Sequence, residues 1–117
     1  MDYKYISYEK KDDICLVHVT TSGYLNLEIG EEVFNLCKKL IDEGNMKLLL
    51  DLKLTKMVNS IGVSMLIEVI EILEDMNGEL AFCNMKPIVE KTFKIMGLSN
   101  YATLFDTQEQ ALSSEWK

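Results

Sequence analysis

The segment MVNSIGVSML, residues 57–66, carries the polar side chains whose types and spacing are best suited to chemistry. Asn59 and Ser60 stand between two apolar runs, and Gly62 follows closely. A short oxygen-bearing side chain at a helix start can accept a hydrogen bond from a first-turn N–H, which stabilises the helix by about 1 kcal/mol. Capping by Asn59 or Ser60 would explain the pair by itself. Because Gly62 costs roughly 1 kcal/mol relative to alanine inside a helix, we expect close approach there by another backbone or by a partner.

Cysteine and histidine offer the other candidate chemistry, a nucleophilic pair. Such a pair would need Cys15, Cys37 or Cys83 beside His18, with a third group to orient the imidazole. The cysteines are odd in number, widely spaced and set in apolar runs, which is typical of reduced core thiols rather than of disulfides or metal ligands. No phosphate-binding glycine loop, zinc spacing or dinucleotide fingerprint occurs. We therefore expect no enzyme activity, no metal and no cofactor.

Composition restricts the classes of partner. The 117 residues are 48% hydrophobic and 26% charged, which suits a single domain with one core over residues 1–117. A net charge of −7 opposes binding to nucleic acid or to an anionic membrane, and a basic protein partner fits better. No apolar run reaches the roughly 20 residues that cross a membrane, and the charged N-terminus is unlike a signal peptide. The sequence predicts a cytoplasmic protein.

The first half of the chain predicts the elements that lead to the serine. Strand patterns over residues 3–9 and 14–21 flank a KKDD turn and predict an N-terminal β-hairpin. SGYLN then breaks the strand pattern. Apolar residues at helical spacing predict a first helix between Leu27 and Glu43. The apolar run over residues 47–52 predicts a strand that is buried on both faces.

The second half of the chain repeats the alternation. We expect a second helix over 61–76, a strand over 80–85, a third helix that begins at Pro87, a short strand over 101–105 and a last helix over 107–116. This order predicts an α/β fold with a mixed, mostly parallel sheet, entered by the N-terminal β-hairpin, with about four helices packed on it.

Several motifs together resemble the STAS family of anti-sigma-factor antagonists. They are LLLDL with the VNSIGV that follows it, GYLN after the second strand, and KPIVEKTFKIMGL over residues 86–98. At the second-helix entry the family usually carries Asp-Ser-(Ser, Thr or Ala)-Gly, and this chain carries Asn59-Ser60-Ile61-Gly62. The resemblance covers nearly the whole chain and implies a STAS-like fold.

The resemblance also implies a function. In that family the motif serine is phosphorylated by a serine kinase that doubles as the anti-sigma factor, and a serine phosphatase reverses the modification. The unmodified antagonist binds the anti-sigma factor and frees the sigma factor, which is called partner switching. By position, the phosphorylated residue would be Ser60. Asn59 and Asn26 stand where the family usually or frequently has aspartate, and each removes a charge that could pair with a basic partner group.

The segments around the serine are expected to contact the partner. The predicted contact residues are Asn26, Met57, Asn59, Ser60, Ile61, Gly62, Val63, Ser64, Glu68 and Glu71. The acidic outer face of the second helix is either solvated or meets a basic partner surface. A phosphate would add about −1.5 to −2 charges at a helix N-terminus, where the dipole favours anions. Phosphorylation should therefore switch binding without unfolding the protein.

A second interpretation fits the same motifs. The chain would be a STAS module that is never phosphorylated, acting as a subunit of an assembly such as a lipid-transport complex or as a small-ligand sensor. Ser60 would then be only a cap and contact residue. In either case we expect a monomer or weak dimer.

Overall fold

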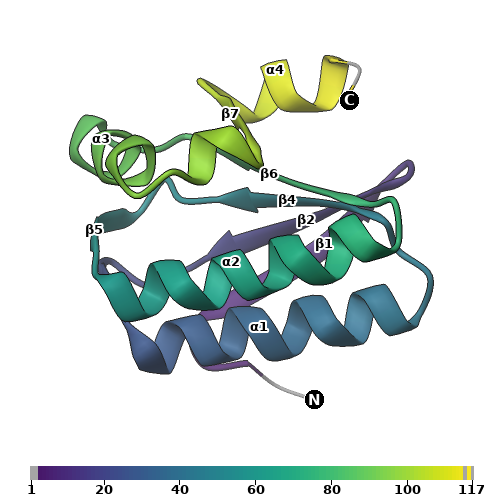
Figure 1. Ribbon diagram of the computed structural model, residues 1–117, viewed down its shortest axis with the longest axis horizontal. Helices are drawn as coiled ribbons and strands as arrows, with labels where there is room; N and C mark the ends of the chain where they lie inside the picture. The colour runs from purple at the N-terminus through teal and green to yellow at the C-terminus, as the bar shows by residue number, and fades with distance from the viewer. Residues whose placement is uncertain (1–2, 115, 117) are drawn as a thin grey trace.

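The fold combines a five-stranded mixed sheet, a two-stranded sheet and four α-helices within residues 3–114 and 116, which the computed structural model describes (Figure 1). The strands are β1 (Ile6–Lys11), β2 (Ile14–Val19), β3 (Gly23–Leu25), β4 (Lys47–Asp51), β5 (Thr55–Val58), β6 (Glu79–Cys83) and β7 (Thr103–Phe105). The helices are α1 (Leu27–Asp42), α2 (Ser60–Asp75), α3 (Pro87–Ile95) and α4 (Gln108–Ser113), with a 3₁₀ turn at Leu98–Asn100.

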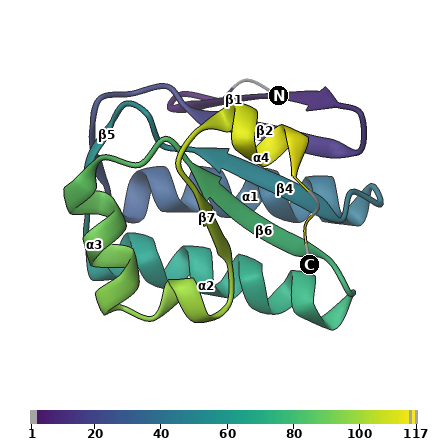
Figure 2. The ribbon, with the colours of Figure 1, turned by 90° about the horizontal axis from the view of Figure 1, so that it is seen from above.

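The larger sheet has the order β1-β2-β4-β6-β7. Its first two strands form the antiparallel hairpin, and every later pair is parallel. Helices α1 and α2 cover one face of this sheet and α4 lies over the other (Figure 1). The view from above places β5, α3 and the starts of α1 and α2 at one end of the molecule (Figure 2). The predicted α/β fold is therefore confirmed.

Strand β4 shows why its sequence is almost entirely apolar. Leu48 and Leu50 belong to the core beneath α1 and α2, and Leu49 belongs to a second core beneath α4. All three side chains are at most 1% exposed. Central parallel strands are covered on both faces, so they lose the alternation of surface strands. The strand prediction for this run is confirmed.

The smaller sheet was not predicted. SGYLN was expected to break the strand pattern and no strand was predicted between residues 52 and 61, but Gly23–Leu25 and Thr55–Val58 pair as parallel strands β3 and β5. The Asn59 backbone N–H extends this pairing with a 3.2 Å bond to the Leu25 carbonyl. Strands of three and four residues are too short to show periodicity, and each exists because the other satisfies its backbone.

Gly62 is the position where α2 meets this small sheet. A Cβ built on Gly62 would overlap the Leu25 carbonyl oxygen and lie 2.8 Å from the carbonyl carbon. The close approach expected from the sequence is therefore made by the backbone of β3. Because main-chain atoms cannot rotate away as a flexible side chain can, the contact fixes where α2 begins relative to β3 and β5.

We predict that Gly62→Ala lowers the free energy of unfolding by about 1–3 kcal/mol, because overpacking forces backbone shifts. Gly30→Ala is the matched control, since Gly30 also lies in a helix but a Cβ added there would meet the flexible Met65 side chain at 3.1 Å. We expect a change below about 1 kcal/mol there. Urea denaturation of the two variants measures the difference, and equal stabilities would contradict the constraint.

Candidate functional site

Ser60 is the first residue of α2 and is exposed to solvent. The cap of this helix is Asn59, whose Oδ1 accepts a 2.8 Å hydrogen bond from the Gly62 backbone N–H. The two sequence alternatives for the cap are thereby resolved. Within the described part of the chain, the Ser60 hydroxyl has no hydrogen-bond partner, so the helix does not require it and a reagent can reach it.

A second helix begins beside the first. Asn26 caps α1 by accepting a 3.2 Å hydrogen bond from the Ile29 backbone N–H. The sequence assigned Asn26 only a partner-binding role, although an asparagine before an apolar helical pattern is itself a cap signal. Both starting ends lie at the same end of the molecule (Figure 2). Helix N-termini carry partial positive charge, and neither asparagine neutralises it.

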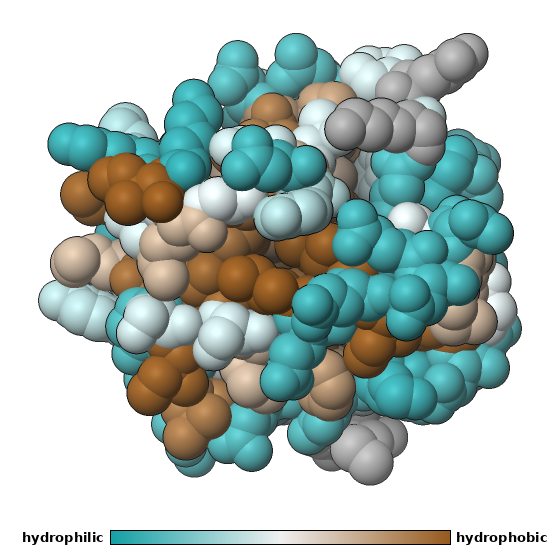
Figure 3. Space-filling model, viewed as in Figure 1, coloured by the Kyte–Doolittle hydropathy of each residue, from teal (hydrophilic) through white to brown (hydrophobic). Residues whose placement is uncertain are grey.

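Exposed apolar side chains lie in the elements at the same end of the molecule as Ser60, and we call them the apolar rim (Figure 2). The rim consists of Tyr24, Leu27, Met57 and Ile61, which are 56%, 48%, 39% and 49% exposed. Tyr24 and Met57 are register partners in the β3–β5 pair, and the other two lie in the first turns of α1 and α2. The space-filling view shows hydrophobic residues at this end, among hydrophilic ones, and along the middle of the face, whereas the opposite end is mostly hydrophilic (Figure 3).

The structure places two further exposed residues beside the predicted contacts and two of the predicted contacts beneath the surface. Tyr24 and Leu27 were not among the predicted contacts, because only the pairing of β3 with β5 and the neighbouring helix starts bring them to this end of the molecule. Gly62 and Val63 were predicted as contacts, but both are buried and Val63 is 0% exposed. Their positions in the first turn point them at β3 and the core, so they shape the site from beneath.

The remaining predicted contacts lie along the outer face of α2. Ser64, one turn after Ser60, is exposed, and its hydroxyl donates a 2.8 Å bond to the Ile61 carbonyl. Glu68 and Glu71 are exposed at the following turns. Spacings of four, four and three residues place these side chains on one helix face, which continues from the serine.

Helix α3 extends the exposed apolar surface beyond the rim. Ile88 is 47% exposed and Ile95 is 74% exposed. Basic side chains of Lys91 and Lys94 lie between them along the helix. Because α3 contacts β5, the rim and this helix form neighbouring parts of one end of the molecule (Figure 1).

The cysteines and His18 do not form a nucleophilic pair. Burial raises the pKa of Cys37 to about 12, and burial together with the charge of Asp51 raises the pKa of Cys83 to about 12. Burial also raises the pKa of Cys15. These thiols stay neutral at ordinary pH, and neutral thiols are poor nucleophiles. The His18 ring nitrogens instead lie near carboxylates of Glu9 and Asp51.

Residues 3–114 and 116 offer neither a metal cluster nor a membrane-spanning helix. No group of three or more His, Cys, Asp or Glu side chains there is arranged to hold a metal ion. None of the helices in the same residues has the length and apolar character that crossing a membrane requires.

Comparison with known proteins identifies the family. Residues 5–111 match the family model described as "STAS domain", so the chain belongs to the STAS domain family. A relative from Bordetella bronchiseptica, named "Putative anti-sigma factor antagonist BtrV", is 26% identical over 92 residues, which are 79% of each protein.

Solved structures share the fold. An anti-sigma factor antagonist from Mycobacterium paratuberculosis superposes with a TM-score of 0.79 at 20% identity, over 92% of this chain and 90% of that one. The Bacillus cell fate determinant SpoIIAA in its phosphorylated form superposes with a TM-score of 0.70 at 19% identity, over 92% of this chain and 96% of that one. At these identities the likeness is one of fold.

The cap role of Asn59 can be tested separately from its charge. Asn59→Ala removes the bond to the Gly62 N–H and should lower the free energy of unfolding by about 1 kcal/mol. Asn59→Asp keeps an accepting oxygen at the helix N-terminus and should be at least as stable as wild type. Thermal or urea unfolding measures both, and an aspartate variant as unstable as the alanine variant would contradict the assignment.

Proposed function

We propose that this protein is an anti-sigma-factor antagonist of a partner-switching system. Its unphosphorylated form binds an anti-sigma factor with serine kinase activity and so releases the sigma factor. Phosphorylation of Ser60 ends that binding, and a serine phosphatase restores it. The observation that carries the proposal is the exposed, unbonded Ser60 hydroxyl at a helix start within a rim of exposed apolar side chains. Family membership and the names of the Bordetella and mycobacterial relatives support it.

The accessible hydroxyl meets the needs of a phosphate acceptor. A kinase must place the hydroxyl in line with the transferred phosphoryl group, so an acceptor must be exposed and free of competing bonds. Ser60 meets both conditions, and Asn59 maintains the helix cap independently. By contrast, the exposed Ser64 hydroxyl one turn later is already bonded to the Ile61 carbonyl.

The start of α2 can also accommodate the phosphorylated form of Ser60. A phosphate on Ser60 would carry about −1.5 to −2 charges beside unpaired first-turn N–H groups. The first turn of α2 contains no acidic residue, and both neighbouring caps are neutral asparagines. The dipole favours an anion there by about 0.3–1 kcal/mol. The folded state should therefore keep its stability after modification.

The apolar rim explains how one phosphate could end binding. Exposed aromatic and aliphatic side chains around a small hydroxyl are suited to close packing against a partner, since a desolvated centre supplies most interface energy. A dianion in that centre without a matching cation costs several kcal/mol in desolvation. Each 1.4 kcal/mol changes affinity about tenfold, so the loss would be large.

We expect phosphorylation to map to Ser60 when the purified protein is mixed with candidate anti-sigma kinases of its host and ATP. Mass spectrometry should find phosphate on wild type and on Ser64→Ala, the matched control, and none on Ser60→Ala. A complex that forms without phosphate on Ser60 would favour the alternative of an unphosphorylated STAS subunit or sensor.

Binding variants test the switch itself. Ser60→Ala should bind the anti-sigma factor about as tightly as wild type, whereas Ser60→Asp should bind at least tenfold more weakly, because its charge lies inside the rim. Ser64→Asp adds the same charge one turn away and should have a smaller effect. Calorimetry measures the affinities, and wild-type affinity in Ser60→Asp would refute the mechanism.

The acidic face of α2 makes a separate prediction about association rate. If it meets a basic partner surface, Glu68→Lys and Glu71→Lys should each slow association several-fold at low salt, and the difference should shrink as salt screens the charges. Glu43→Lys changes the charge equally at the other end of α1 and serves as control. If the stopped-flow association rates of all three variants matched wild type, the acidic face would be solvated and would not meet the partner.

A further inference from the structure

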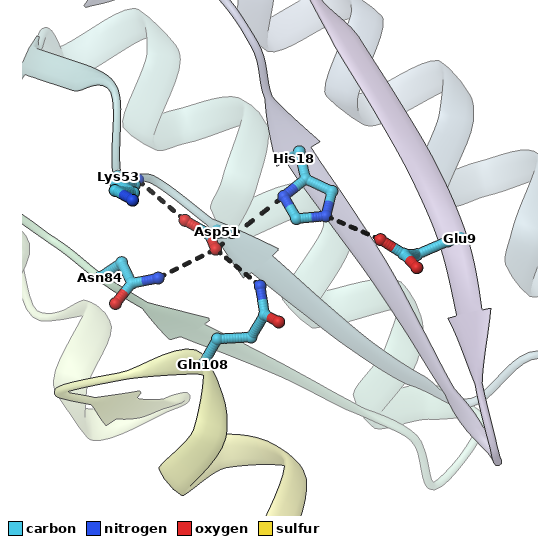
Figure 4. A network of polar contacts seen from close by, with 6 residues as sticks. All are labelled: Glu9, His18, Asp51, Lys53, Asn84 and Gln108. Carbon is cyan, nitrogen blue, oxygen red and sulfur yellow. Dashed lines mark hydrogen bonds and ion pairs between the residues drawn. The ribbon is translucent and has the colours of Figure 1, made fainter.

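A buried carboxylate organises a polar cluster that does not include the serine (Figure 4). Asp51, the last residue of β4, is only 5% exposed. Its Oδ1 accepts a 2.9 Å bond from the Lys53 backbone N–H, and its Oδ2 accepts 3.0 Å bonds from the side-chain amides of Asn84 and Gln108. The donors come from the segments after β4 and β6 and from α4, so the network joins three parts of the fold.

His18 of β2 connects this cluster to the first strand. Its Nδ1 lies 3.9 Å from Asp51 Oδ2, and its Nε2 lies 3.2 Å from Glu9 Oε2 (Figure 4). The imidazole is therefore placed between two carboxylates, one buried and one exposed. The proposed phosphorylation switch uses none of these groups.

A cavity of about 630 Å³ opens above the cluster, at the carboxyl ends of β2, β4 and β6. Besides the residues of the cluster, it is lined by side chains from β1 and β2 and from the start of α4. Open α/β sheets bind ligands at this edge, because the segments that follow the strands are held by the rigid sheet.

The hydrogen bonds to Asp51 determine what the cavity offers a ligand. A carboxylate only accepts, so Asn84 and Gln108 must turn their NH₂ groups toward it. Their amide oxygens then face elsewhere, as Figure 4 shows. Neither oxygen has a hydrogen-bond partner in residues 3–114 or 116. Both residues line the cavity, each donates one N–H to the aspartate, and each keeps an amide oxygen that is free to accept a hydrogen bond.

The charged side chains that line the cavity also favour a ligand that donates hydrogen bonds. Asp51 and Glu109 line it, and the single lysine among its lining residues is the exposed Lys53. Within the described residues, no lysine lies within ion-pair distance of Asp51, whose bonded donors are neutral amides. A buried carboxylate that no lysine pairs with gains from a nearby cation.

We propose that this cavity binds a small organic cation that carries several N–H donors, such as an alkylguanidinium. Its N–H groups donate to the free amide oxygens of Asn84 and Gln108, and its charge faces the carboxylates of Asp51 and Glu109. The site is separate from Ser60, so it stands or falls independently of the phosphorylation proposal.

Matched probes test the ligand class on the intact protein. Butylguanidinium should produce saturable amide shifts at Thr20, Lys53, Asn84 and Glu109 in ¹⁵N-resolved NMR titrations. Butylurea has the same shape without the charge, and tetramethylammonium has the charge without N–H donors, so each should bind at least tenfold more weakly. Butylguanidinium shifts that do not saturate, that are matched by either control, or that centre on Ser60 would overturn the proposal.

Variants test the residues. Asp51→Asn should weaken butylguanidinium binding at least tenfold. Because that change alters a buried network, the exposed Glu109→Gln provides a second test that leaves the network intact, and it should weaken binding several-fold. Glu43→Gln removes one charge at a distance and should leave binding unchanged. Equal affinities in Glu109→Gln and Glu43→Gln would overturn the charge argument, and folded Asp51→Asn with wild-type affinity would overturn the site.

Discussion

The contact between the first turn of α2 and the backbone of Leu25 is the constraint on which the serine site depends. The Leu25 carbonyl oxygen accepts a hydrogen bond from the Asn59 backbone N–H, and it lies directly against Gly62. Both contacts involve main-chain atoms, so they set the position of Ser60 whatever its own side chain carries. Only glycine fits, because any Cβ would occupy the volume of the carbonyl. Gly62, whose residue type destabilises a helix, is therefore what allows α2 to begin at this position.

In this arrangement the structural roles at the start of α2 are filled by residues other than Ser60. Asn59 caps the helix, Gly62 admits the β3 backbone, and Val63 packs in the core, so none of these tasks falls to Ser60. The serine can therefore change its charge without loss of a structural bond. Neutral asparagine at both helix starts keeps the caps that aspartate would provide. Glu28 lies in the first turn of α1, whereas the first turn of α2, where Ser60 lies, contains no acidic residue to offset the positive helix end. A partner would then meet less negative charge here before phosphorylation.

Local periodicity predicted the elements whose signal lies within their own residues. Helices α1 and α2 and strand β4 each present enough apolar positions to define their period. Strands β3 and β5 could not be predicted, because each is stabilised by a partner about thirty residues away. Asp51 was seen only as part of an apolar strand. Its burial depends on the side-chain amides of Asn84 and Gln108, 33 and 57 residues further along the chain, and no local sequence pattern predicts such distant donors.

The segment between β4 and β5 connects the two sites that the fold creates. It begins where the Lys53 N–H is bonded to Asp51 and ends where the Asn59 N–H is bonded to Leu25. Between them Leu54 lines the polar cavity and Met57 belongs to the apolar rim. A short segment bonded at both ends has little freedom to move independently of its anchors. The position of the rim therefore depends on the polar cluster as well as on the small sheet, although the two sites present opposite chemistry.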